Sequence, residues 1–90
     1  APPDPRLLSL APERRINPLN TEVEVTAWVR NFGGVAHDVR LRLEASPGIE
    51  VIGETEKRAP DIGFDVMRTV VWRIRARRPA AGKVRVTIDC

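Results

Sequence analysis

The sequence is poor in the residues that carry most protein chemistry. Its 90 residues include no tyrosine, one histidine (His37) and one cysteine (Cys90). One histidine and one cysteine are too few for a zinc site, and the carboxylates lack the spacing of a calcium-binding loop. No serine or cysteine stands near His37 in a strained turn, as a nucleophilic relay requires. We therefore predict no catalytic residue, no cofactor, no metal site and no enzymatic activity.

Long apolar runs are also missing. No stretch approaches the roughly 20 apolar residues that cross a bilayer, and the opening "APPDPR" has neither the basic nor the apolar region of a signal peptide. We predict no membrane insertion. Pro2, Pro3 and Pro5 have no N–H groups for a sheet and are typical of a stiff linker. We expect residues 1–5 to be a linker that follows another domain, and residues 6–90 to form one domain.

The single cysteine excludes an internal disulfide. Cys90 is the last residue of the sequence, so it is either half of a bond to a segment outside the sequence or a small apolar residue. It follows Val84, Val86 and Ile88 at intervals of two residues. This phase favours a buried side chain.

The basic residues outnumber the acidic ones by 15 to 12, and all except Lys57 and Lys83 are arginines. Such an excess suits phosphate recognition, but genome composition produces it without any function. The arginines alternate with apolar residues and form no continuous run, which is typical of a solvated strand face. With Phe32 and Phe64 in turns and no tyrosine, no aromatic platform is left for stacking bases. We predict no nucleic-acid partner.

What the sequence does contain is regular alternation of apolar and polar residues, which indicates half-buried strands. The alternation is strict in four segments, residues 22–30, 38–45, 68–76 and 83–89. Weaker strands are predicted at residues 6–11 and 49–53. Clusters of Asn, Gly and Pro separate the segments, and no helical pattern lies between them. The pattern predicts an all-β fold, an antiparallel sandwich of about six to seven strands.

The inward positions of the strands predict the core. They are occupied by Val25, Ala27, Val29, Leu41, Leu43, Val70, Trp72, Ile74, Val84 and Val86. On the outward side, pairing of segments 22–30 and 68–76 would place Glu22 and Glu24 beside Arg73 and Arg75. A second outward cluster, formed by Arg40, Arg42 and Arg85, is diluted by Asp38, Glu44 and Asp89.

The stretch "NFGG" interrupts the alternation after residue 30. Asn31, Gly33 and Gly34 take a positive φ at little cost, and we expect them to use that freedom in a turn between two strands. A phosphate-binding loop would need a lysine and a following helix, whereas "NFGGVAHDV" leads into a strand.

Three longer stretches resemble one family. They are "VEVTAWVRNFGGVAHDVRLRL", "SPGIEV" and "TVVWRIRARRPAAGKVRVTID". Together they are similar to CARDB-type domains, the cell-adhesion-related modules of bacteria, and to the related module associated with alpha-galactosidases. The positions that match are turn and core residues, such as Val29, Asn31, Gly34 and Leu41. The resemblance implies an immunoglobulin-like, or fibronectin type III-like, sandwich.

The resemblance also implies a function. Such modules are non-catalytic parts of larger secreted, cell-surface or envelope proteins. We therefore expect an accessory module, a spacer or a protein-interaction and adhesion unit, in an extracytoplasmic prokaryotic protein. Its expected partners are neighbouring domains of the parent chain, with another protein or a polysaccharide as further candidates.

The alternative is a carbohydrate-binding module that assists a neighbouring glycan-active domain. Trp28 is the outward aromatic residue on a strand, and Phe32 is close to it in the turn. Against this, large apolar groups are usually covered, here by the N-terminal segment or a neighbouring domain. The candidate ligand contacts are Trp28, Phe32, Arg40, Arg42 and Arg85.

The strand predicted at residues 83–89 is the last one in the sequence. In the resembled family this strand is commonly followed by one more, so we expect an open sheet edge here. Either the segment around "RINPL", residues 15–19, covers it, or it pairs with a continuation of the chain or with a partner. A solvated edge without consequence is the other possibility.

Overall fold

The computed structural model describes residues 1–11, 20–78 and 82–90. Within these ranges the chain is all-β and has seven strands. They are β1 (Pro5–Ala11), β2 (Glu22–Asn31), β3 (Val39–Ala45), β4 (Ile49–Ile52), β5 (Glu56–Ala59), β6 (Met67–Ala76) and β7 (Val84–Asp89). No helix in the described ranges is long and apolar enough to cross a membrane.

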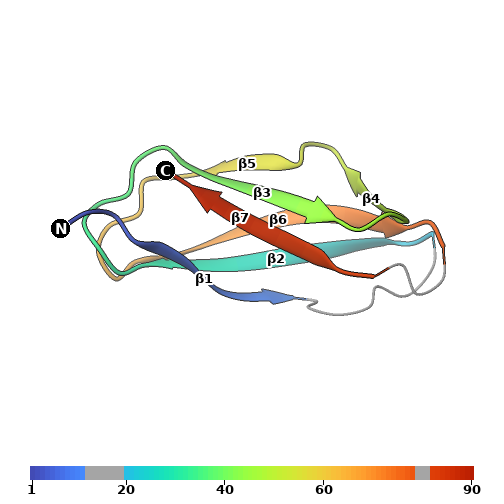
Figure 1. Ribbon diagram of the computed structural model, residues 1–90, viewed down its shortest axis with the longest axis horizontal. Helices are drawn as coiled ribbons and strands as arrows, with labels where there is room; N and C mark the ends of the chain where they lie inside the picture. Colours follow the sequence, from blue (N-terminus) through green and yellow to red (C-terminus); the bar gives the residue numbers. More distant parts are fainter. Residues whose placement is uncertain (12–19, 79–81) are drawn as a thin grey trace.

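The strands form two antiparallel sheets that pack face to face. One sheet has the order β1-β2-β6-β4 and the other the order β5-β3-β7. Figure 1 shows β3 and β7 lying in front of β2 and β6, and the Cα atoms extend over 45 × 20 × 16 Å. The predicted fold, an antiparallel immunoglobulin-like sandwich, is confirmed. All six predicted strands are present close to their expected bounds.

The seventh strand, β5, was not predicted. Its sequence is "EKRA", and only its last residue is buried. β5 is a sheet edge that pairs with β3 between Val39↔Ala59 and Arg42↔Glu56. Its strand conformation therefore follows from the backbone of β3, because its own residues carry no apolar alternation.

The core lies between the two sheets and contains every residue predicted for it. Its largest member is Trp72 on β6, which is 1% exposed. The indole Nε1 of Trp72 donates a hydrogen bond to the carbonyl oxygen of Thr55 at 3.0 Å. The ring thus fills the space between the sheets, while its one polar atom is satisfied by the segment that leads into β5.

The predicted charge ladder on the outer face of the first sheet is also confirmed. The register of β2 and β6 sets Glu22 opposite Arg75 and Glu24 opposite Arg73. The Arg75 guanidinium lies 3.4 Å from the Glu22 carboxylate. Pairs of this kind, open to solvent, contribute less than about 1 kcal/mol each, so the ladder explains these arginines without a ligand.

Both ends of the chain differ from what the sequence predicts. Cys90 is exposed, so the prediction of a buried side chain is wrong. The alternation stops at Asp89, where β7 ends, and nothing holds Cys90 in phase with Ile88. At the other end Pro5, expected in the linker, is the first residue of β1.

Replacement of Trp72 by alanine should lower the free energy of unfolding by about 3–5 kcal/mol, because it leaves a large cavity and removes the indole hydrogen bond to Thr55. Urea denaturation monitored by circular dichroism measures this. Val71→Ala, at the exposed neighbouring position on β6, should change the same quantity by less than about 1 kcal/mol. Equal effects of the two substitutions would contradict the assigned strand phase.

Candidate functional site

One buried amide organises the end of the sandwich where β2 stops. Asn31 is fully buried, and its side chain makes four hydrogen bonds. The Oδ1 atom accepts from the N–H groups of Asp4 at 3.0 Å and Gly33 at 3.1 Å. The Nδ2 atom donates to the carbonyl oxygens of Gly34 and Ile62, both at 2.7 Å. All four hydrogen-bonding positions of the amide are used, so its burial carries no unsatisfied polar atom.

Asn31 joins three segments that are far apart in the sequence, namely the N-terminal residues and the loops 32–38 and 60–66. The backbone reinforces this junction, since Phe32 N–H donates to Asp4 at 3.0 Å and Gly34 N–H donates to Pro2 at 3.1 Å. Asp65 N–H donates to the Asn31 carbonyl at 2.7 Å. The N-terminal residues expected to be a linker therefore continue the hydrogen bonding of β1 as far as Pro2.

The reason expected for Gly33 and Gly34 is wrong. Neither residue has a positive φ, and neither does Asn31; the positive values in these loops belong to Asp38 (54°) and Asp65 (62°). The glycines are needed because the N-terminal segment runs against them. A Cβ atom on Gly33 would clash with the Pro2 carbonyl oxygen, and one on Gly34 would clash with that of Ala1. Close approach of two backbones, and not turn conformation, explains the pair.

The two loops held by Asn31, together with the first residue of β6, carry apolar side chains that are exposed to solvent. We call these residues the apolar end, and they are Phe32, Val35, Phe64 and Met67. Phe64 is the most exposed of them, at 69%. The loops lie at the left of Figure 1, where the N-terminus also lies. Several exposed apolar side chains at one end of a domain are typical of a surface that contacts another molecule.

Charged groups form the rim of the apolar end. The guanidinium groups of Arg6 and Arg30 lie 5.4 and 5.8 Å from the centroid of the Phe32 ring, within cation–π range. Arg30 is also 2.7 Å from the carboxylate of Asp65. These contacts favour one orientation of the exposed Phe32 ring.

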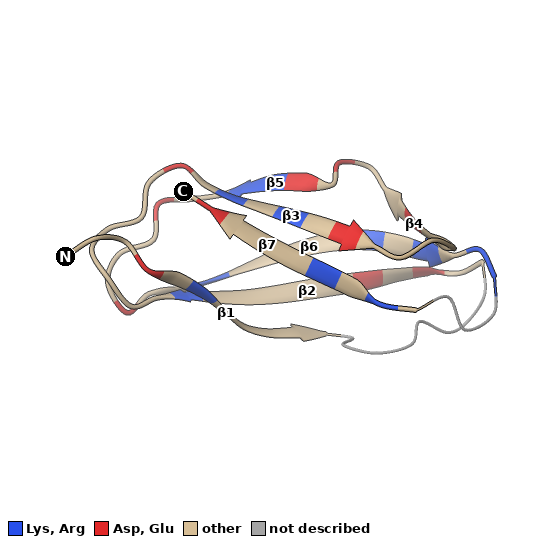
Figure 2. Ribbon diagram, viewed as in Figure 1, with Lys and Arg blue, Asp and Glu red and all other residues tan. Residues whose placement is uncertain are grey.

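The arginine cluster predicted on the second sheet exists, and two of its three arginines lie in ion pairs. Arg40 lies 3.0 Å from Asp89, and Arg85 lies 2.7 Å from Glu44. The hydrogen bond from Arg85 and its positive charge hold the pKa of Glu44 below its ordinary value. Figure 2 shows basic and acidic positions interspersed along β3 and β7. This face is therefore not a basic patch that would attract an anion.

The five candidate contacts do not form one site. Trp28 lies on β2 of the first sheet, and Phe32 lies in the loop that follows β2. Trp28 faces outward and is half-buried between its register partners Ser9 and Thr69. Arg40, Arg42 and Arg85 belong to the outward face of the second sheet. The sandwich separates the two groups, so no single ligand contacts both.

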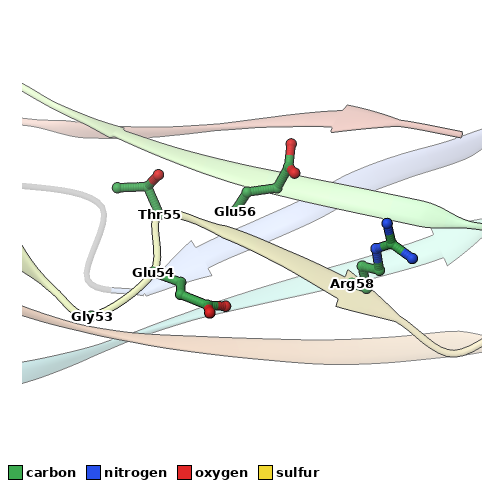
Figure 3. A pocket seen from close by; sticks show the side chains of 5 residues that line it. All are labelled: Gly53, Glu54, Thr55, Glu56 and Arg58. Atoms are coloured by element: carbon green, nitrogen blue, oxygen red, sulfur yellow. The ribbon is translucent and has the colours of Figure 1, made fainter.

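The most evident depression in the described surface lies beside β5 and is open to solvent. It is lined by Gly53, Glu54, Thr55, Glu56 and Arg58. In Figure 3 the side chains of Glu54 and Glu56 point away from each other, and Arg58 lies further along the strand. A binding pocket encloses its ligand and directs several polar groups at it, and this depression does neither. The described residues also contain no group of three or more His, Cys, Asp or Glu that could hold a metal ion.

Comparison with known proteins adds no assignment. No protein-family model, curated protein or solved structure matches the chain. The site therefore has to be interpreted from its own residues.

Of the apolar end, only Phe32 was among the candidate contacts. Val35, Phe64 and Met67 were missed because an apolar residue in a predicted turn looks incidental when each turn is considered alone. Two turns, "NFGGV" and "GFDVM", carry such residues, and this was the available signal. It becomes a patch only when the Asn31 junction brings the turns together.

Replacement of Asn31 by alanine should lower the free energy of unfolding by about 2–4 kcal/mol, because it removes all four hydrogen bonds of the buried amide. Amide hydrogen exchange should accelerate at Phe32 and Gly34 in the same variant. Thr69→Ala, at an exposed position of β6, is the matched control and should change neither measurement. Unchanged exchange at Phe32 and Gly34 in Asn31→Ala would show that the N-terminal segment is held without the amide.

Proposed function

We propose that this chain is a non-catalytic accessory module, a spacer or protein-interaction unit in a larger extracytoplasmic prokaryotic protein. The observation that carries the proposal is the apolar end. Four apolar side chains are exposed here, three on the two loops that the buried Asn31 joins and one at the start of β6. A fixed apolar centre with a charged rim has the composition of a protein–protein interface.

The partner that fits this surface is a neighbouring domain joined through the N-terminus. Ala1 and Pro2 lie against Gly34 and Gly33, in the same loop as Phe32. A domain that precedes Ala1 would therefore be tethered beside the apolar end, and Pro2 and Pro3 stiffen the tether. A short tether raises the effective concentration of the two surfaces, so even a modest apolar patch suffices for contact.

The paired charges on the outer faces support the spacer part of the proposal. Exposed ion pairs keep these faces solvated and contribute little free energy to the binding of a partner. The apolar end is therefore the part of the sandwich that we expect to contact a partner. The extracytoplasmic location rests on the resemblance of residues 23–43 to CARDB-type modules. It is a proposal from sequence.

The test compares the isolated chain with the longer protein that contains the preceding domain. Amide exchange in the loops 32–38 and 60–66 should be slower in the longer protein, and Phe64→Ser should abolish this difference. Val71→Ser, at an exposed position away from the apolar end, should leave it unchanged. Equal exchange of both loops in the two proteins would contradict contact between the domains.

The second candidate is carbohydrate binding, and the observation that favours it is the setting of Trp28. Its ring lies on the outward face of the first sheet, between the hydroxyl-bearing residues Ser9 and Thr69. Aromatic rings beside polar side chains are the usual components of a sugar site. Trp28 is half-buried, which leaves less of the ring for stacking than a fully exposed aromatic residue offers.

We expect no tight glycan binding. Addition of soluble plant and bacterial polysaccharides should leave the tryptophan fluorescence without saturable quenching, because Trp72 is buried and Trp28 is partly covered. Trp28→Ala is the control and retains Trp72 as its fluorophore. Saturable quenching that disappears in Trp28→Ala, with the free energy of unfolding retained, would rank carbohydrate binding first.

A further inference from the structure

The inference concerns the free edge of β7 and does not depend on the proposed function. In the part of the chain that the structure describes, β7 pairs with β3 on one side and with no strand on the other. Figure 1 shows β7 as the outer strand of its sheet. The segment expected to cover this edge, residues 15–19, lies outside the described residues. An unpaired strand edge is a template for another strand.

The hydrogen bonds to β3 determine which backbone groups of β7 face outward. Lys83 lies just before β7 and faces Ser46. The Lys83 carbonyl accepts a hydrogen bond from the Ser46 N–H at 3.0 Å, and the Lys83 N–H donates one to Ser46 Oγ at 3.1 Å. Along an antiparallel strand, the backbone N–H and C=O groups of successive residues point alternately toward one neighbouring strand and away from it. The backbone groups of Arg85, Thr87 and Asp89 therefore face β3. Those of Val84, Val86 and Ile88 face away from it.

We propose that the free edge of β7 pairs with β7 of a second copy of this chain, antiparallel and centred on Thr87. In this register Val86 and Ile88 of each copy exchange backbone hydrogen bonds, which uses the groups that face away from β3. Thr87 faces Thr87 of the second copy in a non-hydrogen-bonded pair, where side chains approach most closely. The product is one continuous sheet of six strands, three from each copy.

The charge of β7 is self-complementary, which favours a second copy of this chain as the partner strand. In the Thr87-centred register, Arg85 of each copy stands opposite Asp89 of the other. Both side chains are 75% exposed, so each is free to meet a second partner in addition to its own ion pair. The resulting row across the sheet is Glu44, Arg85, then Asp89 and Arg40 of the second copy. Its charges alternate in sign, and the row occurs twice by symmetry.

The other registers match less well. The backbone groups that face outward belong to Val84, Val86 and Ile88. In any register that forms hydrogen bonds, these residues of one copy must therefore stand opposite such residues of the other copy. Centring the pair on Arg85 sets Arg85 against itself, which is repulsive. Centring it on Val86 sets Arg85 opposite Thr87 and leaves Asp89 facing Lys83, outside the strand. The Thr87-centred register alone joins both charged pairs within β7.

The apolar side of β7 also fits. Val86 is buried and Ile88 is half-buried, and each would pair with the other across the contact. Leu7 and Leu8 of β1, the edge strand of the first sheet, are exposed. β1 lies close to β7, so a strand added to β7 would approach these leucines. Apolar support below the new strand adds burial to the backbone pairing.

The first experiment uses charge exchange and sedimentation over a wide range of protein concentrations. The parent chain should form dimers. Asp89→Arg and Arg85→Glu should each dimerise at least roughly tenfold more weakly, since both cross-strand pairs become repulsive. An equimolar mixture of the two variants should dimerise again, because both charge pairs between the two copies are then of opposite sign. Phe64→Ser should leave the dimer intact, which separates this edge from the apolar end.

Amide exchange provides the structural readout. Protection of Val84, Val86 and Ile88 should grow with protein concentration, while that of Arg85 and Thr87 should not. A chain that stays monomeric at every concentration would overturn the proposal. Concentration-independent protection of Val84, Val86 and Ile88 would also overturn it, because a segment of the same chain would then occupy the edge.

A cysteine at the symmetry axis tests the register. In the doubly substituted chain T87C and C90S, the two thiols should form an intermolecular disulfide on mild oxidation, because the Cα atoms of a non-hydrogen-bonded pair are about 4.5 Å apart. The matched control is R42C with C90S, on the same face but on β3. Equal cross-linking of both variants, or none in T87C, would contradict the Thr87-centred register.

Discussion

The buried amide of Asn31 is the interaction on which the end of this sandwich depends. Its four hydrogen bonds tie the N-terminal segment to the loops that follow β2 and β5. An unpaired amide at this depth would be costly, so the side chain is either fully satisfied or strongly destabilising. This condition gives two loops one fixed arrangement. Phe64 is exposed on one of these loops.

The surface divides into parts with different chemistry. The outer faces carry exposed pairs of opposite charge, which contribute solubility and strand register but little free energy of unfolding. The core supplies the stability, with Trp72 as its largest member. Among the described residues, the apolar end and the free edge of β7 are two places where burial or backbone pairing is incomplete. Any partner of this domain has more to gain there than on the charged faces.

Strand positions and the core were predictable from the sequence because alternation reports directly which side of a sheet is buried. β5 was not predictable, since an edge strand of charged residues takes its conformation from its neighbour. The burial of Cys90 was wrongly predicted because buried and exposed side chains alternate only as far as the strand extends, and β7 ends at Asp89. The role of Asn31 and of the glycines after it depends on Pro2 and Asp4, which are remote in sequence. Local turn preferences gave a plausible but incorrect reason for them.

The N-terminal segment has a mechanical consequence. β1 starts at the apolar end and runs antiparallel to β2, with Pro5 opposite Asn31. A pull on Ala1, directed outward along the long axis, loads the hydrogen bonds between β1 and β2 in parallel, so they must break together. The bulge between Leu7 and Ser9 divides this ladder into two shorter zones. Tension would therefore load first the hydrogen bonds between Pro5 and Leu7, next to Asn31. Those between Ser9 and Ala11 would be loaded only after the first group breaks.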